Sequence, residues 1–311
     1  MNTRQVAKGD RAFFAVSTAA AFFTMSLVFA VLIFLSVRSW RTFSEQGLAF
    51  ITGSTWDATS TPGTFQLMPM LVGTLLVSIL GLIIAVPTSV AVAYFIEYMA
   101  PPKVSKIATA LIDLLAALPS VVIGLWGLYV LIPHAVSWSK LLSTHLGFIP
   151  FFRTDFDNAQ GAPFIAGWTV AIMIIPIITS VSREVMGRVD KELVSAASAL
   201  GGTNFSTMRR VVIPTAKSGI LGGILLGLGR ALGETVAIYF VLNLVFETNL
   251  YRILEPKGGN VASLIVAKFA EATATEISAL MAAGVVLFVL TLIVNMIATS
   301  IVQRAERKMA S

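Results

Sequence analysis

Six apolar stretches, each about as long as a bilayer core is thick, dominate this sequence of 311 residues. A helix needs roughly 20 mostly apolar residues to cross that core. The chain is 56% hydrophobic and 12% charged, whereas soluble domains usually carry about 25% charged residues. The pattern predicts an all-α membrane protein with six transmembrane helices. These helices are expected at residues 13–36, 71–98, 108–133, 164–181, 218–246 and 278–302, with a break in the third at Pro119 and Ser120.

The Lys and Arg residues between the apolar stretches predict the orientation. With the N-terminus inside the cell, the inner segments hold 14 of these residues and the outer segments hold 7, while Arg230 lies within the fifth stretch. Basic residues accumulate in the cytoplasmic loops of membrane proteins. We therefore expect both termini in the cytoplasm. The net charge of +6 is then explained by contact with anionic membrane lipid, and no nucleic-acid partner is indicated.

Long outer loops are expected at residues 37–70, 134–163 and 247–277. They are either solvated linkers or a docking surface for an external partner. His134 and His145 fall in the second loop without metal-ligand spacing, and the chain has no Cys, so we expect no metal site. There is no phosphate-binding loop of the Gly-x-x-x-x-Gly-Lys-Ser/Thr type and no hydrolase or metalloprotease motif. The chain is therefore not expected to be an enzyme.

The longest inner segment is expected at residues 182–217. Apolar residues recur there with helical spacing as far as Gly201 and Gly202, which stop the helix. A second short helix begins near Thr203, and Pro214 fixes the entry into the next apolar stretch. From the residues alone, this segment is either an interfacial amphipathic helix or a contact surface for a partner.

Two charged residues are predicted in the middle of the fifth helix. Arg230 and Glu234 lie four residues apart, on one face of a continuous helix. Charges at bilayer depth are costly, so they normally pair or face a functional pathway. Either the two form a buried ion pair that fixes packing, or Arg230 attracts a passing anion while Glu234 holds the Arg side chain in place. Small residues on nearby stripes predict close helix packing: Gly223, Gly227 and Gly233.

The inner segment resembles the "EAA" loop found in permeases of binding-protein-dependent ABC importers of type I. The residues that carry the resemblance are Ser-Ala-Ala-Ser-Ala-Leu-Gly at 195–201 and Val-Val-Ile-Pro at 211–214. Ser195 stands where the family pattern has Glu. The resemblance implies that residues 189–214 form a coupling segment that docks into a cleft of a cytoplasmic ATPase. It assigns ATPase coupling to Ser195, Ala196, Ala197, Gly201 and Pro214.

The stretch Leu-Gly-Leu-Gly-Arg-Ala-Leu-Gly-Glu-Thr at 226–235 resembles the signature of the phosphate-specific (Pst) permease family. From about residue 40 onward the chain resembles the PstC branch of that family. The resemblance implies that Arg230 and Glu234 serve phosphate passage. Further matching stretches are 47–50, 56–57, 115–122, 172–176 and 268–272.

The resemblance also implies the domain organisation and the localisation. Residues 1–70 would form a cytoplasmic tail, the first transmembrane helix and the first outer loop. Residues 71–300 would form the type I ABC permease domain, and residues 301–311 a cytoplasmic tail. The protein would then be a multi-pass protein of the bacterial cytoplasmic (inner) membrane.

By this resemblance, the chain is expected to be the permease subunit of an ATP-driven importer that moves inorganic phosphate into the cell by alternating access. The implied partners are a PstA-like second permease subunit, two copies of a PstB-like ATP-binding subunit and an external PstS-like phosphate-binding protein. No cofactor is expected on this chain, because ATP and Mg²⁺ would bind the partner ATPase. The alternatives are a permease for molybdate or sulfate, the sister PstA-type subunit, a self-contained secondary transporter or channel, and a membrane enzyme.

Overall fold

Helices make up nearly all of the regular structure in the computed structural model, which describes residues 8–156 and 158–310 and the side chains of 13–156 and 158–303. Six segments are long and apolar enough to cross a membrane, so the predicted all-α architecture with six spans is confirmed. These segments are Phe13–Gln46, Met68–Met99, Ser120–Leu146, Pro163–Gly187, Asn204–Gly233 and Ala274–Gln303. The basic residues of the two tails that entered the charge comparison lie outside the described side chains.

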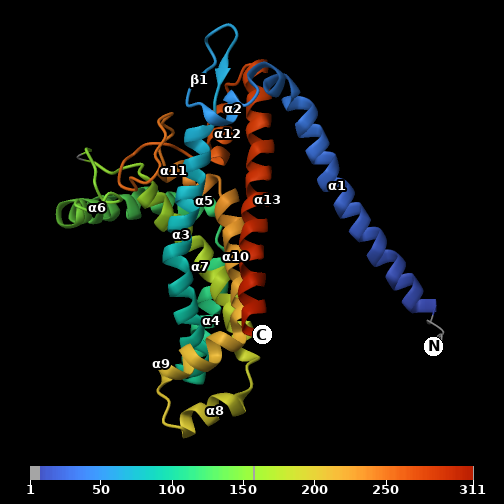
Figure 1. The fold of residues 1–311 in the computed structure, drawn as a ribbon, viewed down its shortest axis with the longest axis vertical. Helices are drawn as coiled ribbons and strands as arrows, with labels where there is room; N and C mark the ends of the chain where they lie inside the picture. Colours follow the sequence, from blue (N-terminus) through green and yellow to red (C-terminus); the bar gives the residue numbers. More distant parts are fainter. Residues whose placement is uncertain (1–7, 157, 311) are drawn as a thin grey trace.

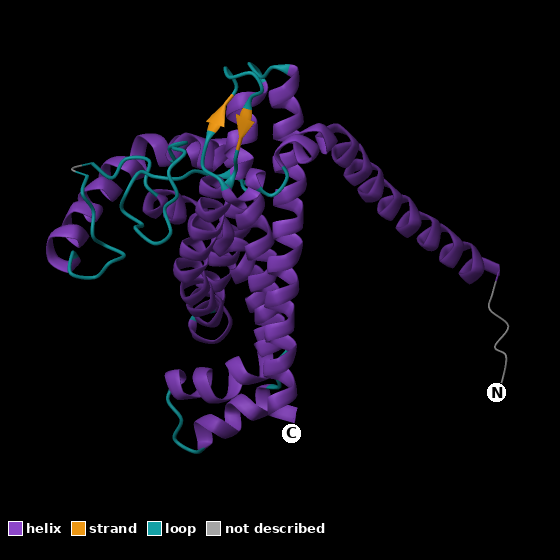
Figure 2. Cartoon of the chain, turned by 45° about the horizontal axis from the view of Figure 1, so that its top comes forward, coloured by secondary structure: helices purple, strands orange, loops and turns teal. Residues whose placement is uncertain are grey.

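Most of the long helices run side by side in one bundle (Figures 1 and 2), and three of them pack together at its centre. They are α3 (Met68–Tyr94), α7 (Pro163–Gly187) and α10 (Ile213–Gly233). The first two pack along each other through small residues. A Cβ atom on Gly81 would lie 2.8 Å from Val170 Cγ1, and one on Gly167 would lie 2.7 Å from Leu80 Cβ. Glycines at these positions therefore let α3 and α7 approach closely, as helices in lipid require.

Replacing Gly167 by Ala is expected to destabilise this interface. The new methyl group would meet Leu80 Cβ, which is fixed to the α3 backbone and cannot swing away. Overpacking of this kind costs about 1–3 kcal/mol. The matched control is Gly222→Ala in α10, because a Cβ atom there meets nothing within 4 Å. Thermal unfolding of the detergent-solubilised protein should show a lower midpoint for Gly167→Ala alone. Equal midpoints for the two variants would contradict the close contact.

The first helix, α1 (Lys8–Gln46), stands apart from the bundle. Its outer end contacts α13 (Ala274–Ala310), where Thr42 Oγ1 donates a hydrogen bond to Ser278 Oγ at 2.9 Å and Ser278 Oγ donates to Arg38 O at 3.0 Å. The most apolar part of α1 buries nothing within the chain. In Figure 1 the start of α1 and the end of α13 both point toward the end of the molecule that carries α8 (Lys191–Ala199), as expected for termini on one side of the membrane.

The third predicted helix differs from the structure at its outer end. It breaks between α4 (Pro102–Ala117) and α5 (Ser120–Trp126), as Pro119 predicts. Beyond α5 the chain does not enter a loop near residue 134. It continues through the π-helical stretch η2 (Gly127–Leu131) into α6 (Ile132–Leu146), which projects from the side of the bundle (Figure 1). The predicted outer loop at 134–163 is therefore wrong for its first part, because the helix continues to Leu146 and buries Ile132, Ala135 and Ser139 along one side.

The fifth predicted helix is wrong in its second half. α10 ends at Gly233, Glu234 is extended (φ −69°, ψ 130°), and the short helix α11 (Val236–Val241) follows. At its other end α10 begins at Ile213, five residues before the predicted start. The apolar run from 218 to 246 therefore contains a helix break inside the bundle.

The outer segments fold onto the ends of the membrane helices. The short helix α2 (Ala49–Thr52) is followed by a two-stranded antiparallel ribbon, β1 (Trp56–Asp57) and β2 (Thr64–Phe65). Trp56 Nε1 donates a hydrogen bond to Glu276 Oε1 at 2.8 Å, which ties the ribbon to α13. The last outer segment contains α12 (Val261–Phe269), whose first turn is buried. Regular structure is thus present in both the 37–70 and the 247–277 segments.

Candidate functional site

The helix break at the end of α10 separates the two charges that the sequence predicts on one helical face. Glu234 is only 7% exposed, and its Oε1 accepts a hydrogen bond from the backbone N–H of Ala237 at 3.3 Å. Arg230 is exposed one turn before the break. No ion pair joins Arg230 to Glu234 or to any other described carboxylate. The predicted geometry of the pair is therefore wrong, because the chain leaves the helix between the two residues.

A polar side chain of α12 bonds this break, and α12 is itself bonded to α3. Ser263 Oγ donates a hydrogen bond to Thr235 O at 3.1 Å, and the N–H of Val261 donates to Thr74 Oγ1 at 3.1 Å. Asn260 caps α12 by accepting the Ser263 N–H at 3.0 Å, and within the described chain its buried amide nitrogen has no partner. A broken helix at membrane depth is tolerated where protein or a water-lined pathway satisfies its backbone groups.

The glycines of α10 divide between two faces. A Cβ atom on Gly227 would lie 2.8 Å from Ile178 Cδ1, and one on Gly223 would lie 3.1 Å from Val181 Cβ, so these two glycines pack against α7. On Gly233 a Cβ atom would meet nothing within 4 Å, so its predicted packing role has no counterpart within this chain. We call a neighbouring stripe of α10 residues, none of which is buried, the open face of α10: Gly222, Leu226, Gly229, Arg230 and Gly233. Arg230 thus supplies positive charge on a surface that the described residues leave at least partly exposed.

The inner segment has the predicted order of short helix, glycine turn and short helix. After α8 the chain turns at Gly201, with φ of +81°, into α9 (Asn204–Thr207) and the π-helical stretch η3 (Met208–Val212). Asp190 caps α8 by accepting the Glu192 N–H at 2.9 Å. Pro214 lies in the first turn of α10. The helix cap at Asp190 and the turn at Gly201 therefore determine how the inner segment folds.

The inner segment exposes apolar side chains at the end of the molecule. Leu200 is 90% exposed, Phe205 65% and Leu193 50%. α8 has no buried residue and projects from the inner end of the bundle (Figure 1). Around these side chains lie Ser195, Ala196 and Ala197 on α8 itself. Exposed apolar side chains on a projecting helix are typical of a surface that docks against another protein. Sequence periodicity identified Leu193 and Leu200 as part of a helical apolar pattern, and the structure adds that both side chains are exposed.

A network of charges joins two outer segments. Arg252 Nη1 lies 2.6 Å from Glu255 Oε1 and 2.9 Å from Asp155 Oδ2, and Lys257 Nζ lies 3.1 Å from Glu247 Oε2. The hydrogen bonds to Glu255 and Asp155 raise the pKa of Arg252, and the hydrogen bond to Glu247 raises that of Lys257. Both groups therefore stay charged at any physiological pH. The pairs fix the segment after α6 to the segment before α12.

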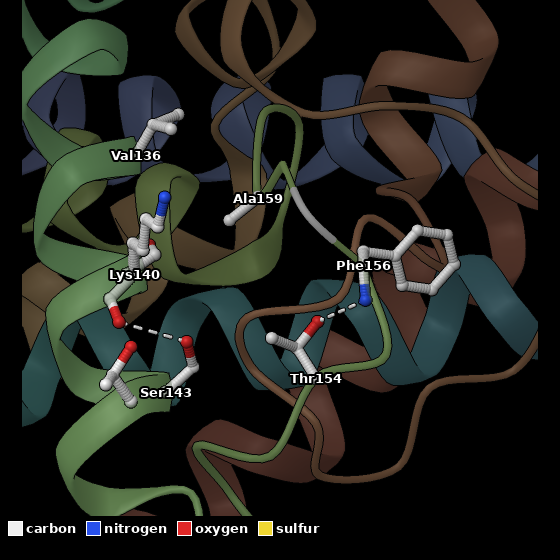
Figure 3. A pocket seen from close by; sticks show the side chains of 8 residues that line it. Val136, Lys140, Ser143, Thr154, Phe156 and Ala159 are labelled. Atoms are coloured by element: carbon white, nitrogen blue, oxygen red, sulfur yellow. Dashed lines mark hydrogen bonds between the residues drawn. The ribbon is translucent and has the colours of Figure 1, made fainter.

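A polar cavity of about 350 Å³ lies beside α6 on the outer side (Figure 3). Ser139 Oγ donates to Ala135 O at 2.7 Å, Ser143 Oγ donates to Lys140 O at 3.1 Å, and Thr154 Oγ1 accepts from the Phe156 N–H at 3.1 Å. Three of the cavity's four hydroxyl groups thus bond within the chain. In Figure 3 the Lys140 amine points away from Ser143 and Thr154, so the cavity does not gather its polar groups around one ligand position.

Metal ligands do not gather in the described part of the chain: no three His, Asp or Glu residues lie close enough to hold an ion. His134 and His145 both lie on α6, where each ring contacts the backbone oxygen one turn before it.

Comparison with known proteins gives a consistent picture. Residues 85–310 match the family model described as binding-protein-dependent transport system inner membrane component. The phosphate transport system permease protein PstC of Pasteurella multocida is 38% identical over 294 residues, which cover 93% of this chain and 90% of that protein. The protein of the same name from Xylella fastidiosa is 36% identical over 312 residues, covering 97% and 93%. A PstC 2 protein from Mycobacterium tuberculosis is 34% identical over 307 residues, covering 97% and 94%.

Solved structures with the same fold are more distant in sequence. A chain of the bacterial alginate ABC transporter, crystallised with an alginate pentasaccharide-bound periplasmic protein, superposes with a TM-score of 0.64 at 16% identity and covers 96% of each chain. A chain of the inward-facing MetNI methionine ABC transporter superposes with a TM-score of 0.51 at 15% identity, covering 76% of this chain and 92% of that one.

Proposed function

Because the chain belongs to the family of binding-protein-dependent transport system inner membrane components, we propose that it is the permease subunit through which such a system imports inorganic phosphate. It is a multi-pass protein of the bacterial inner membrane and a transport subunit rather than an enzyme. Phosphate is proposed because the relatives that align over nearly the whole chain carry that substrate in their names.

The observation that carries the proposal is the position of Arg230. Its guanidinium group lies on the open face of α10, one turn from a helix break within the bundle, with no carboxylate paired to it among the described residues. The planar guanidinium fork matches the oxygens of a tetrahedral oxyanion. Glu234 is turned into the fold by its bond to Ala237, so its charge does not neutralise Arg230 on that face. Glu234 then contributes to the pathway indirectly, because its bond to Ala237 helps to maintain the helix break.

The open face of α10 and the inner segment suit a system of several subunits. A PstA-like permease would cover the open face, so that phosphate passes between the two subunits along Arg230. Two PstB-like subunits would bind ATP and Mg²⁺ and close against the 189–214 segment, because this chain has no phosphate-binding loop of its own. A PstS-like protein would deliver phosphate to the outer end. Alternating access follows if closure of the ATPase moves the coupling segment and opens the pathway outward.

Uptake of labelled phosphate tests this function directly. Cells lacking the gene should lose high-affinity uptake at micromolar phosphate, and cells given the gene back should regain it. ATP depletion should abolish the restored uptake, because transport is driven by hydrolysis in the partner. Sulfate and molybdate are measured in parallel as controls. Loss of sulfate or molybdate uptake, with phosphate uptake intact, would show that the protein transports that oxyanion and not phosphate. Restored uptake that survives ATP depletion would refute the ATP-driven mechanism.

A further inference from the structure

The inner end of the bundle has a hydrophobic cluster of its own. It joins the ends of α3 and α7 to the start of α10, and it is distinct from the larger cluster at the centre. Its buried members are Ala93, Tyr94, Met186, Val189, Val212, Ala216 and Ile220. The inner segment 189–212 is continuous in the chain with α7 and with α10, but not with α3. Any displacement of that segment therefore reaches α3 only through side-chain contacts.

Two stacked tyrosines at the end of α3 provide such contacts. The rings of Tyr94 and Tyr98 lie 5.0 Å apart at 28°. The Tyr94 hydroxyl donates a hydrogen bond to the carbonyl of Asn204 at 3.0 Å, and the Tyr98 hydroxyl donates to the carbonyl of Met186 at 2.6 Å. Asn204 is the first residue of α9, immediately after the glycine turn, whereas Met186 belongs to α7. The two neighbouring tyrosines thus bond two different elements: Tyr94 bonds α9 and Tyr98 bonds α7.

The backbone on both sides of the Tyr94 contact departs from regular α-helix. Tyr94 is followed directly by η1 (Phe95–Met99), and α9 is followed directly by η3. Such π-helical turns shift the hydrogen-bond register by one residue and occur preferentially at functional sites. The Tyr94 side chain is only 5% exposed, so nearly all of its surface is packed against the protein. The bond therefore joins two segments that can each adjust their backbone.

We propose that Tyr94 is a positioning residue that ties α3 to the coupling segment, so that movement of the segment shifts α3 together with α10. This inference rests on the coupling role proposed for residues 189–214. Through η1, α3 continues into α4 and hence to the break at Pro119 in the third span. The Tyr94 bond thus extends the influence of the coupling segment to two further helices that are not adjacent to it in the chain.

The test compares Tyr94→Phe with Tyr98→Phe in the complete transporter, reconstituted in liposomes with its ATP-binding partner. Each variant loses one hydroxyl and keeps its ring in the stack. The number of labelled inorganic phosphate ions imported per ATP hydrolysed should fall about twofold to tenfold in Tyr94→Phe, the range that corresponds to one hydrogen bond. In Tyr98→Phe this ratio should match that of the wild-type transporter. An unchanged ratio in Tyr94→Phe, or an equal fall in both variants, would overturn the proposal.

A distance measurement provides a second test that does not depend on the substrate. The chain has no Cys, so spin labels can be attached to cysteines introduced at Met99, which is 50% exposed, and at Arg210, which is exposed in η3 and is not one of the apolar docking residues. The distance between the labels should stay the same in the ATP-free and ATP-bound transporter, and should change on ATP binding once Tyr94→Phe is added. If this distance changes on ATP binding in the transporter that keeps Tyr94, the proposed link between α3 and the coupling segment is refuted. If the wild-type transporter imports no phosphate, the proposed substrate fails, while the distances still decide this inference.

Discussion

Replacing Arg230 by Ala should reduce phosphate uptake about tenfold to a hundredfold, the range that corresponds to one charge-assisted hydrogen bond to an anion. In this structure the guanidinium group makes no ion pair with a described carboxylate and lies on the open face of α10. Its removal therefore costs the fold little, and the loss should appear in transport rather than in assembly. Uptake of labelled phosphate and the amount of assembled complex in the membrane are measured on the same cells.

The control for this variant is Arg230→Lys. Lysine keeps the positive charge but lacks the planar fork, so its uptake should lie between that of the wild type and that of Arg230→Ala. Normal uptake by a fully assembled Arg230→Ala transporter would show that Arg230 has no role in phosphate passage. Equal losses in the Ala and Lys variants would show that the geometry of the fork, and not the charge alone, is required.

The second large effect is expected at the inner end of the molecule. Leu200→Asp places a charge on the most exposed apolar side chain of the inner segment, just before the Gly201 turn. If this surface docks into the ATPase, a buried charge without a partner should weaken binding by about 2 kcal/mol or more, which is roughly thirtyfold. Co-purification of the ATP-binding subunit with the tagged permease measures the effect, and uptake should fall in proportion.

The matched control for Leu200→Asp is Phe148→Asp. Phe148 is 80% exposed and lies in the segment after α6, on the outer side. It receives the same charge without approaching the ATPase, so co-purification should be unchanged. Unaltered co-purification and uptake in Leu200→Asp would contradict docking through this surface.

The inner segment could be predicted from sequence because short-range chemistry determines it. Gly201 adopts a positive φ that other residues rarely adopt, and Asp190 caps α8, which begins at the next residue, by accepting the Glu192 N–H. The six spans were predictable for a similar reason, since length and apolarity alone are sufficient for a helix in lipid.

The break at Glu234 could not be predicted in this way. The apolar run continues beyond it to residue 246, and no proline interrupts the run. What holds the break is a bond from Ser263 to the carbonyl of Thr235, which joins residues 28 positions apart. Arg230 was identified because a charge in an apolar run is rare, but its supposed pairing with Glu234 assumed an unbroken helix. Tyr94 was missed because its acceptor is a backbone carbonyl 110 residues away.

The separate position of α1 has a consequence for biosynthesis. Its hydrogen bonds to α13 run through Ser278, and they join residues 236 and 240 positions apart. A ribosome adds about 5–20 residues per second, so the first helix enters the membrane roughly 12 to 50 seconds before its docking site on the last helix has been synthesised. During that interval its contact surface for α13 is unfilled by this chain. Truncating the chain before residue 274 should therefore leave α1 inserted but undocked, and available to whichever neighbouring subunit reaches it first.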